Sequence, residues 1–339
     1  FLIHSVTFSV TKVKLNKLLS KNRRLSMKLK EIIKDFKFHC EYEKNLSTKT
    51  LQAYKIDLEQ FLNFKDYKNI DINNFDKYKI KDYIQNLYIQ EFKAKTIKRK
   101  IAVLKALFSY LEFEEIILVS PFRKMRVAIK EPKNLPKTIQ LREIKKVLKY
   151  LYRQKEQFED KNIYSYKALV RDIGIVEILF TTGIRVSEVC NIKRENINLQ
   201  TGIIIIQGKG NKERVIQICD SEVKKTLKEY INLFANQLKE NEYFLINRLG
   251  NQISEQSVRL MIKKYQKESG VQKHITPHMF RHSFATLLLE EGVDIRYIQH
   301  MLGHSSISTT QIYTQVNLKQ QKKILNNKHP RRTFNFINE

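Results

Sequence analysis

Between residues 27 and 118, apolar side chains recur every three or four positions, the spacing that gathers them on one face of a helix. Four helices are expected there, over residues 29–40, 47–62, 78–89 and 95–115. Lys98, Arg99 and Lys100 stand between the apolar positions of the fourth helix and would suit phosphate contacts. Residues 1–26 show no sustained period and are expected to be a tail, or sequence upstream of the true start. The pattern predicts a small all-α domain over residues 27–118.

Prolines interrupt the pattern after this domain. They stand at positions 121, 132 and 136 among basic residues, which favours extended chain and predicts a linker over residues 119–137. Helical spacing returns over residues 139–152, 168–180, 222–238, 255–267 and 317–325. These helices predict a second domain over residues 138–326, followed by a basic C-terminal tail over residues 327–339.

One stretch of the second domain has the alternation of a strand pair. Two β-branched runs, residues 203–206 and 214–218, flank a glycine-rich turn that contains Lys209. A lysine in such a turn stands at the tip of an arm that can reach into a groove. The predicted fold class is therefore mainly α with a small β-hairpin, in two domains of which the second is mixed α/β.

The segment that begins at Thr276 carries the first candidate chemistry. Thr276 suits an N-cap and Pro277 the first helical position, so His278 falls in the first turn, where free backbone amides favour anions. Arg281 follows one turn later on nearly the same face. A guanidinium there can hold a phosphate in a bidentate grip beside an imidazole that exchanges protons.

Further polar groups follow in the same segment. A short helix over residues 294–302 is expected to end at Gly303, which leaves His304 just beyond a helix C-terminus. Ser306 then opens another expected helix, which carries Tyr313. The segment thus combines acid–base, phosphate-binding and nucleophilic groups.

A zinc site is the main alternative for these histidines. His278 and His282 share the four-residue spacing of two ligands on one helix face, as do His300 and His304. A metalloprotease helix, however, has Glu directly after its first His, and Met279 stands there instead. Arg281 would also place a permanent positive charge beside the metal. No metal ligand is therefore assigned.

The charge of the chain indicates its class of partner. Among 339 residues, 63 Lys and Arg face 35 Asp and Glu, a net charge of +28 and a sequence pI of about 9.8. This surplus is spread along the chain, which favours a protein wrapped around a polyanion over one that binds a small metabolite. The three cysteines lack any paired spacing and are expected to be reduced thiols. With no long apolar run and no signal-like leader, a cytoplasmic protein without a membrane segment is expected.

Five features in order along the chain resemble one known family. They are Thr-Gly-Ile-Arg-Val-Ser-Glu at 182–188, Lys209 in the hairpin, His-x-x-Arg at 278–281, Leu-Gly-His at 302–304, and Tyr313. In this order and spacing they resemble the tyrosine recombinases, the phage-integrase family, and most closely its bacterial Xer type. The resemblance implies a two-domain DNA clamp, in which a helical SAM-like core-binding domain precedes the catalytic domain.

The resemblance also implies a reaction. Tyr313 would attack a DNA phosphodiester in line, giving a 3′-phosphotyrosyl link and a free 5′-hydroxyl. Because the link keeps the bond energy, no nucleotide cofactor is expected. No metal is expected either, because Arg185, Arg281 and Lys209 would supply the positive charge. Arg185 and Arg281 would hold the non-bridging oxygens, where charge grows in the transition state.

Three further residues would move or hold protons in this reaction. His278 would accept or share a proton, Lys209 would protonate the leaving 5′-oxygen, and His304 would hydrogen-bond the phosphate. The implied catalytic set comprises Arg185, Lys209, His278, Arg281, His304 and Tyr313.

Two neighbouring side chains have simpler explanations. Glu188 lies one turn from Arg185, a spacing that an ordinary intrahelical ion pair also explains, and within the family resemblance it would support Arg185. His282 lies one turn from His278 and is expected to be structural.

The family resemblance implies specific partners. These are double-stranded DNA with inverted half-sites, a homotetramer on two such sites and, for the Xer type, a DNA translocase, with no small-molecule substrate. A C-terminal segment would dock on a neighbouring protomer, with Phe334, Phe336 and Ile337 as its anchor. Chromosome dimer resolution is the expected role. A mobile-element integrase, a type IB topoisomerase-like strand transferase and a catalytically idle DNA-binding protein stay open as alternatives.

Overall fold

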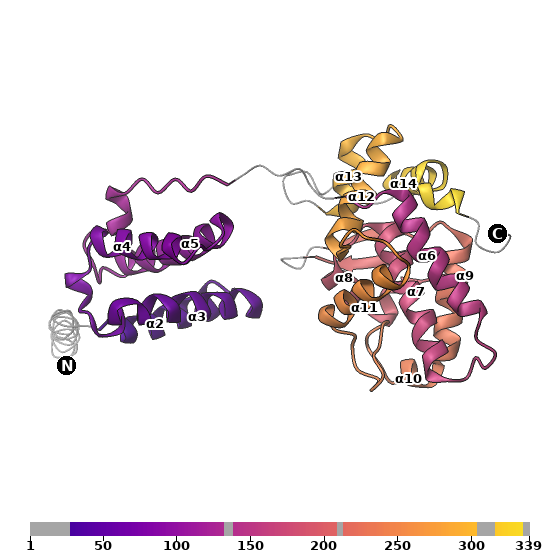
Figure 1. Cartoon of the computed structure of the whole chain (residues 1–339), viewed down its shortest axis with the longest axis horizontal. Coiled ribbons are helices and arrows are strands. Elements are labelled where there is room, and N and C mark those ends of the chain that lie inside the picture. Colours follow the sequence, from indigo (N-terminus) through magenta and orange to yellow (C-terminus); the bar gives the residue numbers. More distant parts are fainter. Residues whose placement is uncertain (1–27, 132–137, 209–212, 304–315, 335–339) are drawn as a thin grey trace, which may run out of the picture. The chain divides into compact units, whose positions relative to one another are not determined.

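A computed structural model describes residues 28–131, 138–208, 213–303 and 316–334, with side chains only from residue 321 in the last of these (Figure 1). The chain divides into two compact units, Phe1–Asn134 and Leu135–Glu339, each with its own hydrophobic core. Helices dominate both, and the second also contains a small antiparallel sheet. The predicted fold class is confirmed. Within the described residues, no helix is long and apolar enough to cross a membrane.

The first unit contains the four predicted helices. They are α2 (Leu29–Phe38), α3 (Thr48–Asn63), α4 (Lys77–Ile89) and α5 (Ala94–Phe113). Ser47 caps α3 by accepting a hydrogen bond from the Thr50 N–H. The prediction for Lys100 was wrong, because this side chain is buried and donates to Asp57 at 2.8 Å. An ammonium taken out of water needs a carboxylate partner, so Lys100 ties α5 to α3 and is not a phosphate contact.

The residues after α5 continue the packing of the first unit. A short 3-10 helix, Pro121–Lys124, places the Phe122 ring 5.9 Å from that of Phe108. Met125, Val127 and Ile129 also pack against this core. Much of the segment expected as a linker therefore covers apolar surface of the first unit, because its alternate residues are hydrophobic.

Helix α7 is the centre of the second unit (Figure 1). The helices of this unit are α6 (Leu141–Glu156), α7 (Tyr164–Thr182), α8 (Val186–Cys190), α9 (Ser221–Leu233), α10 (Ala235–Lys239), α11 (Glu255–Glu268), α12 (Pro277–Glu290), α13 (Ile295–Leu302) and α14 (Val316–Lys328). Helices α6, α8, α9, α11 and α12 all contact α7. The single helix expected over residues 222–238 is divided at Phe234, whose backbone leaves helical geometry and whose ring packs against Tyr230.

The predicted hairpin is present. Strands β2 (Ile203–Gln207) and β3 (Glu213–Gln217) pair antiparallel, with Ile206 opposite Arg214. A two-residue strand that sequence periodicity does not detect, β1 (Ile197–Asn198), pairs with the other edge of β2. The turn that carries Lys209 lies outside the described residues.

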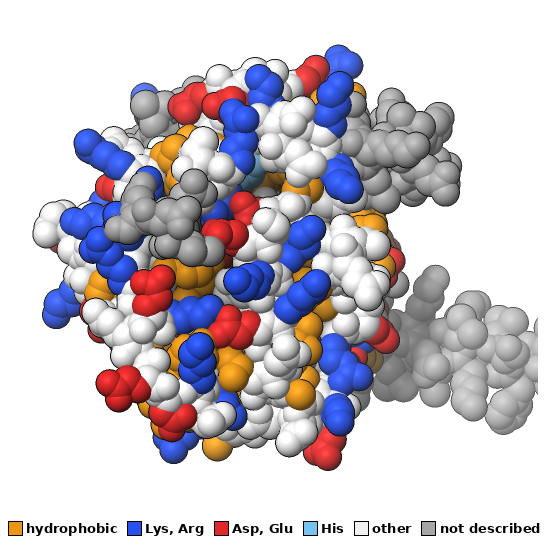
Figure 2. All heavy atoms as spheres, turned by 90° about the vertical axis from the view of Figure 1, so that its right-hand side faces the viewer, with side chains coloured by type: hydrophobic (Ala, Val, Ile, Leu, Met, Phe, Trp, Pro, Cys, Tyr) orange, Lys and Arg blue, Asp and Glu red, His pale blue; other side chains and the backbone are white. Residues whose placement is uncertain are grey.

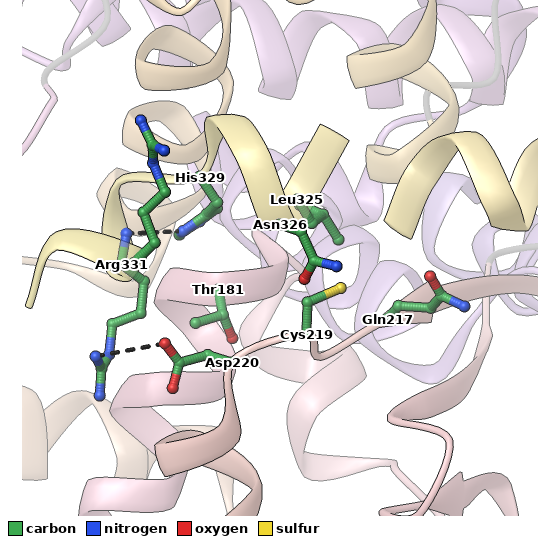
Figure 3. A pocket seen from close by; sticks show the side chains of 9 residues that line it. Thr181, Gln217, Cys219, Asp220, Leu325, Asn326, His329 and Arg331 are labelled. Carbon is green, nitrogen blue, oxygen red and sulfur yellow. Dashed lines mark hydrogen bonds and ion pairs between the residues drawn. The ribbon is translucent and has the colours of Figure 1, made fainter. Parts of the chain in front are cut away.

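The C-terminal segment corrects the prediction that Phe334 is an exposed anchor. Phe334 is buried and stacks on Phe180 of α7, with ring centroids 5.6 Å apart. Arg331 is buried as well and donates from Nε and Nη2 to the Glu177 carboxylate at 2.9 Å. Figure 3 shows the Arg331 guanidinium directed at Asp220, beside a small pocket of about 60 Å³ that Cys219 also lines. Residues 329–334 therefore belong to the core of their own chain; Phe336 and Ile337 lie outside the described residues.

Candidate active site

Helix α12 begins as the sequence predicts. Thr276 is the N-cap residue in extended geometry and Pro277 occupies the first turn, although the Thr276 side chain makes no capping hydrogen bond. His278 is exposed in that first turn, while Arg281 one turn later is buried. The helix therefore presents an accessible imidazole and points a guanidinium inward.

Two helix ends hold the Arg281 guanidinium. Its Nη1 donates to the Gly183 carbonyl at 3.1 Å and its Nη2 to the Leu302 carbonyl at 2.6 Å. Both carbonyls stand at helix C-termini, where the last carbonyls have no partner within the helix. Gly183 closes α7 with φ +62°, and a Cβ there would lie 2.7 Å from the Phe284 ring, so only glycine fits this turn.

Arg185 is the N-cap residue of α8, and its partner is Glu188. Nη1 of Arg185 lies 2.8 Å from Oε1 of Glu188, and the backbone N–H of Arg185 donates to Oε2 at 2.7 Å. Glu188 thus supports Arg185, as expected. The Arg185 side chain remains 40% exposed, whereas that of Glu188 is 6% exposed, so the guanidinium stays available to a ligand.

Arg214 of β3 is a third cation at this site, one that was not predicted from the sequence. Its Nη1 and Nη2 donate to the two Glu188 oxygens at 3.0 and 2.8 Å, and its Nε donates to the Met301 carbonyl at 3.0 Å. A sequence signal was available, because Arg214 shares the strand face of Ile216, which is fully buried. An arginine on the core face of a strand requires a buried acceptor.

The charged groups of this cluster shift one another's pKa values. Desolvation, followed by the nearby charge of Arg185, lowers the pKa of Arg281 to about 10. Burial alone would raise the pKa of Glu188, but hydrogen bonds and charge from Arg214, with those from Arg185, hold it below its usual value. Three guanidinium cations and one carboxylate leave a net charge of +2. Such a cluster can bind an anion with two or more negative oxygens.

Desolvation, followed by the charges of His282 and Arg281, lowers the pKa of His278. The imidazole is therefore neutral near pH 7, the form that can accept a proton. His282 is exposed one turn after His278, and its structural role stays a prediction.

The structure brings together half of the predicted catalytic set. Arg185, His278 and Arg281 share one cluster, in which each arginine lowers the pKa of the histidine. Lys209, His304 and Tyr313 lie outside the described residues. Within the described part of the chain, no three His, Cys, Asp or Glu side chains could jointly hold a metal ion.

Comparison with known proteins identifies the family. Residues 137–320 match the phage integrase family, and residues 33–115 match the phage integrase N-terminal SAM-like domain. The chain belongs to the phage integrase family of tyrosine recombinases. It is 49% identical over 301 residues to a tyrosine recombinase of Agathobacter rectalis, covering 88% of this chain and 96% of that protein. It is 36% identical to the tyrosine recombinase XerC of Thermodesulfovibrio yellowstonii, again over 88% and 96% of the two chains.

Solved structures show that the tyrosine recombinase shares its fold with distant relatives. The XerH site-specific recombinase bound to palindromic difH substrate has a TM-score of 0.64 and 22% identity, covering 86% of this chain and 80% of that one. A lambda integrase dimer, residues 75–356, bound to a COC' core site has a TM-score of 0.63 and 19% identity, over 84% and 100% of the chains. The family's enzymes break and rejoin DNA strands, so this chain is a site-specific recombinase.

Proposed function

We propose that this recombinase cleaves duplex DNA with Tyr313 as nucleophile and rejoins it through a 3′-phosphotyrosyl intermediate. The observation that carries the proposal is the cluster of Arg185 and Arg281 beside an imidazole that is neutral near pH 7. The two guanidinium groups bind the non-bridging oxygens of the scissile phosphate and stabilise the charge that develops during in-line attack. His278 accepts or shares the proton of the reacting hydroxyl.

Two further residues of the predicted set act in the remaining steps. Lys209 protonates the leaving 5′-oxygen, and His304 hydrogen-bonds the phosphate beside the nucleophile. Rejoining reverses the order, because the 5′-hydroxyl of the incoming strand then attacks the phosphotyrosine. The reaction balances without an external oxidant, nucleotide or metal.

In the cell, we propose the role of an Xer-type resolvase of chromosome dimers. The relatives named XerC and XerD match nearly the full length of this chain, which supports this role. The partners would be duplex DNA with inverted half-sites, three further copies of the chain on two such sites and a DNA translocase, all in the cytoplasm. On the face shown in Figure 2, described Lys and Arg side chains are interspersed with acidic and apolar ones, which suits contacts distributed over a large surface.

The test uses genomic fragments of the source organism as the probe. Fragments that the protein captures covalently are recovered, and the cleavage junction is sequenced. The proposal expects inverted half-sites at one chromosomal position. Junctions at the ends of a mobile element would indicate an integrase, and relaxation of one duplex without exchange would indicate a topoisomerase-like activity.

The nucleophile is tested on a nicked duplex built from that junction. Tyr313→Phe keeps the ring and removes the hydroxyl, so the covalent adduct should vanish while DNA affinity changes little. Tyr297→Phe is the matched control, because Tyr297 on α13 is 39% exposed and should not be needed for the adduct. An adduct that persists in Tyr313→Phe would remove Tyr313 as the nucleophile.

A further inference from the structure

Arg214 joins the elements that form the cation cluster. It reaches from β3 to Glu188 of α8 through a bidentate contact and to the C-terminal carbonyl of Met301 on α13. Its side chain is 10% exposed, against 40% for Arg185, so a ligand has far less access to it. Arg214 is therefore poorly placed to bind the phosphate itself.

The side chain of Arg214 packs directly against the backbone of Gly303. Gly303 ends α13 with φ +65°, and a Cβ at this position would lie 2.9 Å from Cδ of Arg214. The missing side chain of Gly303 leaves space for the Arg214 side chain. Glu188 and the Met301 carbonyl then supply the acceptors for its guanidinium.

The carboxylate of Glu188 has two cationic partners that share its Oε1 atom. Nη1 of Arg185 lies 2.8 Å from this oxygen and Nη1 of Arg214 lies 3.0 Å from it. Arg214 alone also contacts Oε2 through its side chain, while the Oε2 contact of Arg185 comes from its backbone N–H. Arg214 therefore carries most of the neutralisation of this carboxylate.

We infer that Arg214 is a positioning residue that neutralises Glu188 and so leaves the charge of Arg185 available to the scissile phosphate. This inference rests on the proposed role of Arg185 as a phosphate ligand. Without Arg214, the carboxylate would have only Arg185 as a side-chain cation and would offset its charge. The net charge of Arg185, Glu188 and Arg281 would then be +1, in place of +2 with Arg214 present.

A lysine would not replace Arg214. One ammonium can hold a single carboxylate oxygen, but it lacks the planar fork that reaches both oxygens and the Met301 carbonyl at once. Arg214→Lys should therefore retain part of the function and rank between the wild type and Arg214→Met.

The test compares Arg214→Met, Glu188→Gln and the double variant of the full chain on the nicked duplex described above. Arg214→Met should slow single-turnover adduct formation by about 10- to 100-fold, with DNA affinity within about threefold. Adding Glu188→Gln removes the carboxylate charge and should raise the rate of Arg214→Met at least tenfold. A purely structural role for Arg214 predicts no recovery, because a second substitution in the same network would only weaken it further.

Two outcomes would overturn the inference. The first is adduct formation by Arg214→Met within twofold of the wild type. The second is a double variant that is no faster than Arg214→Met. If Arg214→Met does not fold, the rate of adduct formation by the double variant is compared with that of Glu188→Gln. A double variant more than tenfold slower than Glu188→Gln would count against the inference.

The matched control is Arg194→Met. Arg194 also donates to a helix C-terminal carbonyl, that of Leu238, but it is not part of the cation cluster. It should leave the rate unchanged. If the wild type itself forms no adduct, the proposed function has failed, whereas normal wild-type cleavage with unaffected Arg214 variants rejects only the role of Arg214.

Discussion

The pKa of His278 depends on side chains of α11 and α12 and on Arg185, the N-cap residue of α8. Desolvation is the largest cause of its lowering, followed by the charges of His282 and Arg281, then Arg185 and Arg259. A residue that accepts a proton acts in its neutral form, so the rate should fall as the pH drops through its pKa. Since this pKa lies below the ordinary value of 6.5, the wild-type rate should decline only below pH 6.5.

We expect His282→Asn to move this decline to higher pH. The substitution removes a neighbouring imidazole that disfavours the charged form of His278, so the pKa of His278 should rise. At pH 8 the rates of variant and wild type should agree, because His278 is neutral in both. The measurement is a pH profile of single-turnover adduct formation, with the exposed His274→Asn as control. Coincident profiles for His282→Asn and the wild type would contradict this explanation.

At the scale of elements, the short 3-10 helix Pro330–Thr333 and the residue before it pack into the second unit. His329 lies between the rings of Phe180 and Phe284, at 5.1 and 5.6 Å. Its Nδ1 accepts the Arg331 N–H at 3.1 Å, which leaves Nε2 protonated to donate to the Phe180 carbonyl at 3.3 Å. Burial lowers the pKa of His329 to about 4.

This histidine should make the second unit sensitive to acid. The unfolded chain binds the proton near pH 6.5 and the folded chain only near pH 4, so stability is lost as the pH falls between them. From pH 7 to pH 4.5 the loss should be about 2.5 kcal/mol. Denaturant unfolding of the wild type and of His329→Gln at both pH values measures it. The variant, which keeps a donor for the Phe180 carbonyl, should lose less. Equal losses would show that the folded chain binds a proton at His329 as readily as the unfolded chain does.

At the scale of the whole molecule, residues far apart in the sequence meet in the core of the second unit. Glu177 has no exposed surface in the middle of α7, and it also accepts a hydrogen bond from Tyr152 of α6 at 3.0 Å. Its charged partner, Arg331, lies 154 residues later. Removing one member of a buried ion pair leaves an uncompensated charge, which typically costs about 3–5 kcal/mol.

Truncation separates this packing from docking on a neighbour. Deleting residues 328–339 removes Arg331 and should lower the unfolding free energy of the second unit by about 3–5 kcal/mol or more, and DNA binding with it. Deleting only residues 335–339 keeps Arg331 and Phe334 and should leave stability within about 0.5 kcal/mol. Thermal and denaturant unfolding of both truncated chains measure these two changes in stability. Equal stability of the two would mean that the Glu177 pair contributes nothing.

The net charge of +28 should govern DNA affinity. Basic residues that neutralise phosphates release counterions, so the logarithm of the affinity should fall with the logarithm of salt concentration with a slope of about −5 or steeper. Titrations of the full chain with duplex DNA from 50 to 200 mM salt measure the slope. A flat response would contradict a protein that encloses duplex DNA.

The sequence by itself determined most of the described helices, the two paired strands and the positions of His278 and Arg281, while Arg185 came from the family resemblance. These follow from local signals, since Ser47 caps a helix through an amide three residues away, and Gly183 and Gly303 end helices through their own positive φ. Local spacing also placed Arg281 one turn after His278. Lys209, His304 and Tyr313 remain predictions.

Only the tertiary structure decided which charges meet. Arg214 reaches Glu188 across 26 residues, and Arg331 reaches Glu177 across 154, so neither spacing carries a periodic signal. The alternation along β3 can place Arg214 on the core face, but it does not identify Glu188 as its partner. Arg331 has no such signal in a chain with 63 Lys and Arg, and Phe334 in a basic tail was predicted to be an exposed anchor. A buried ion pair depends on desolvation, and desolvation depends on how distant elements pack.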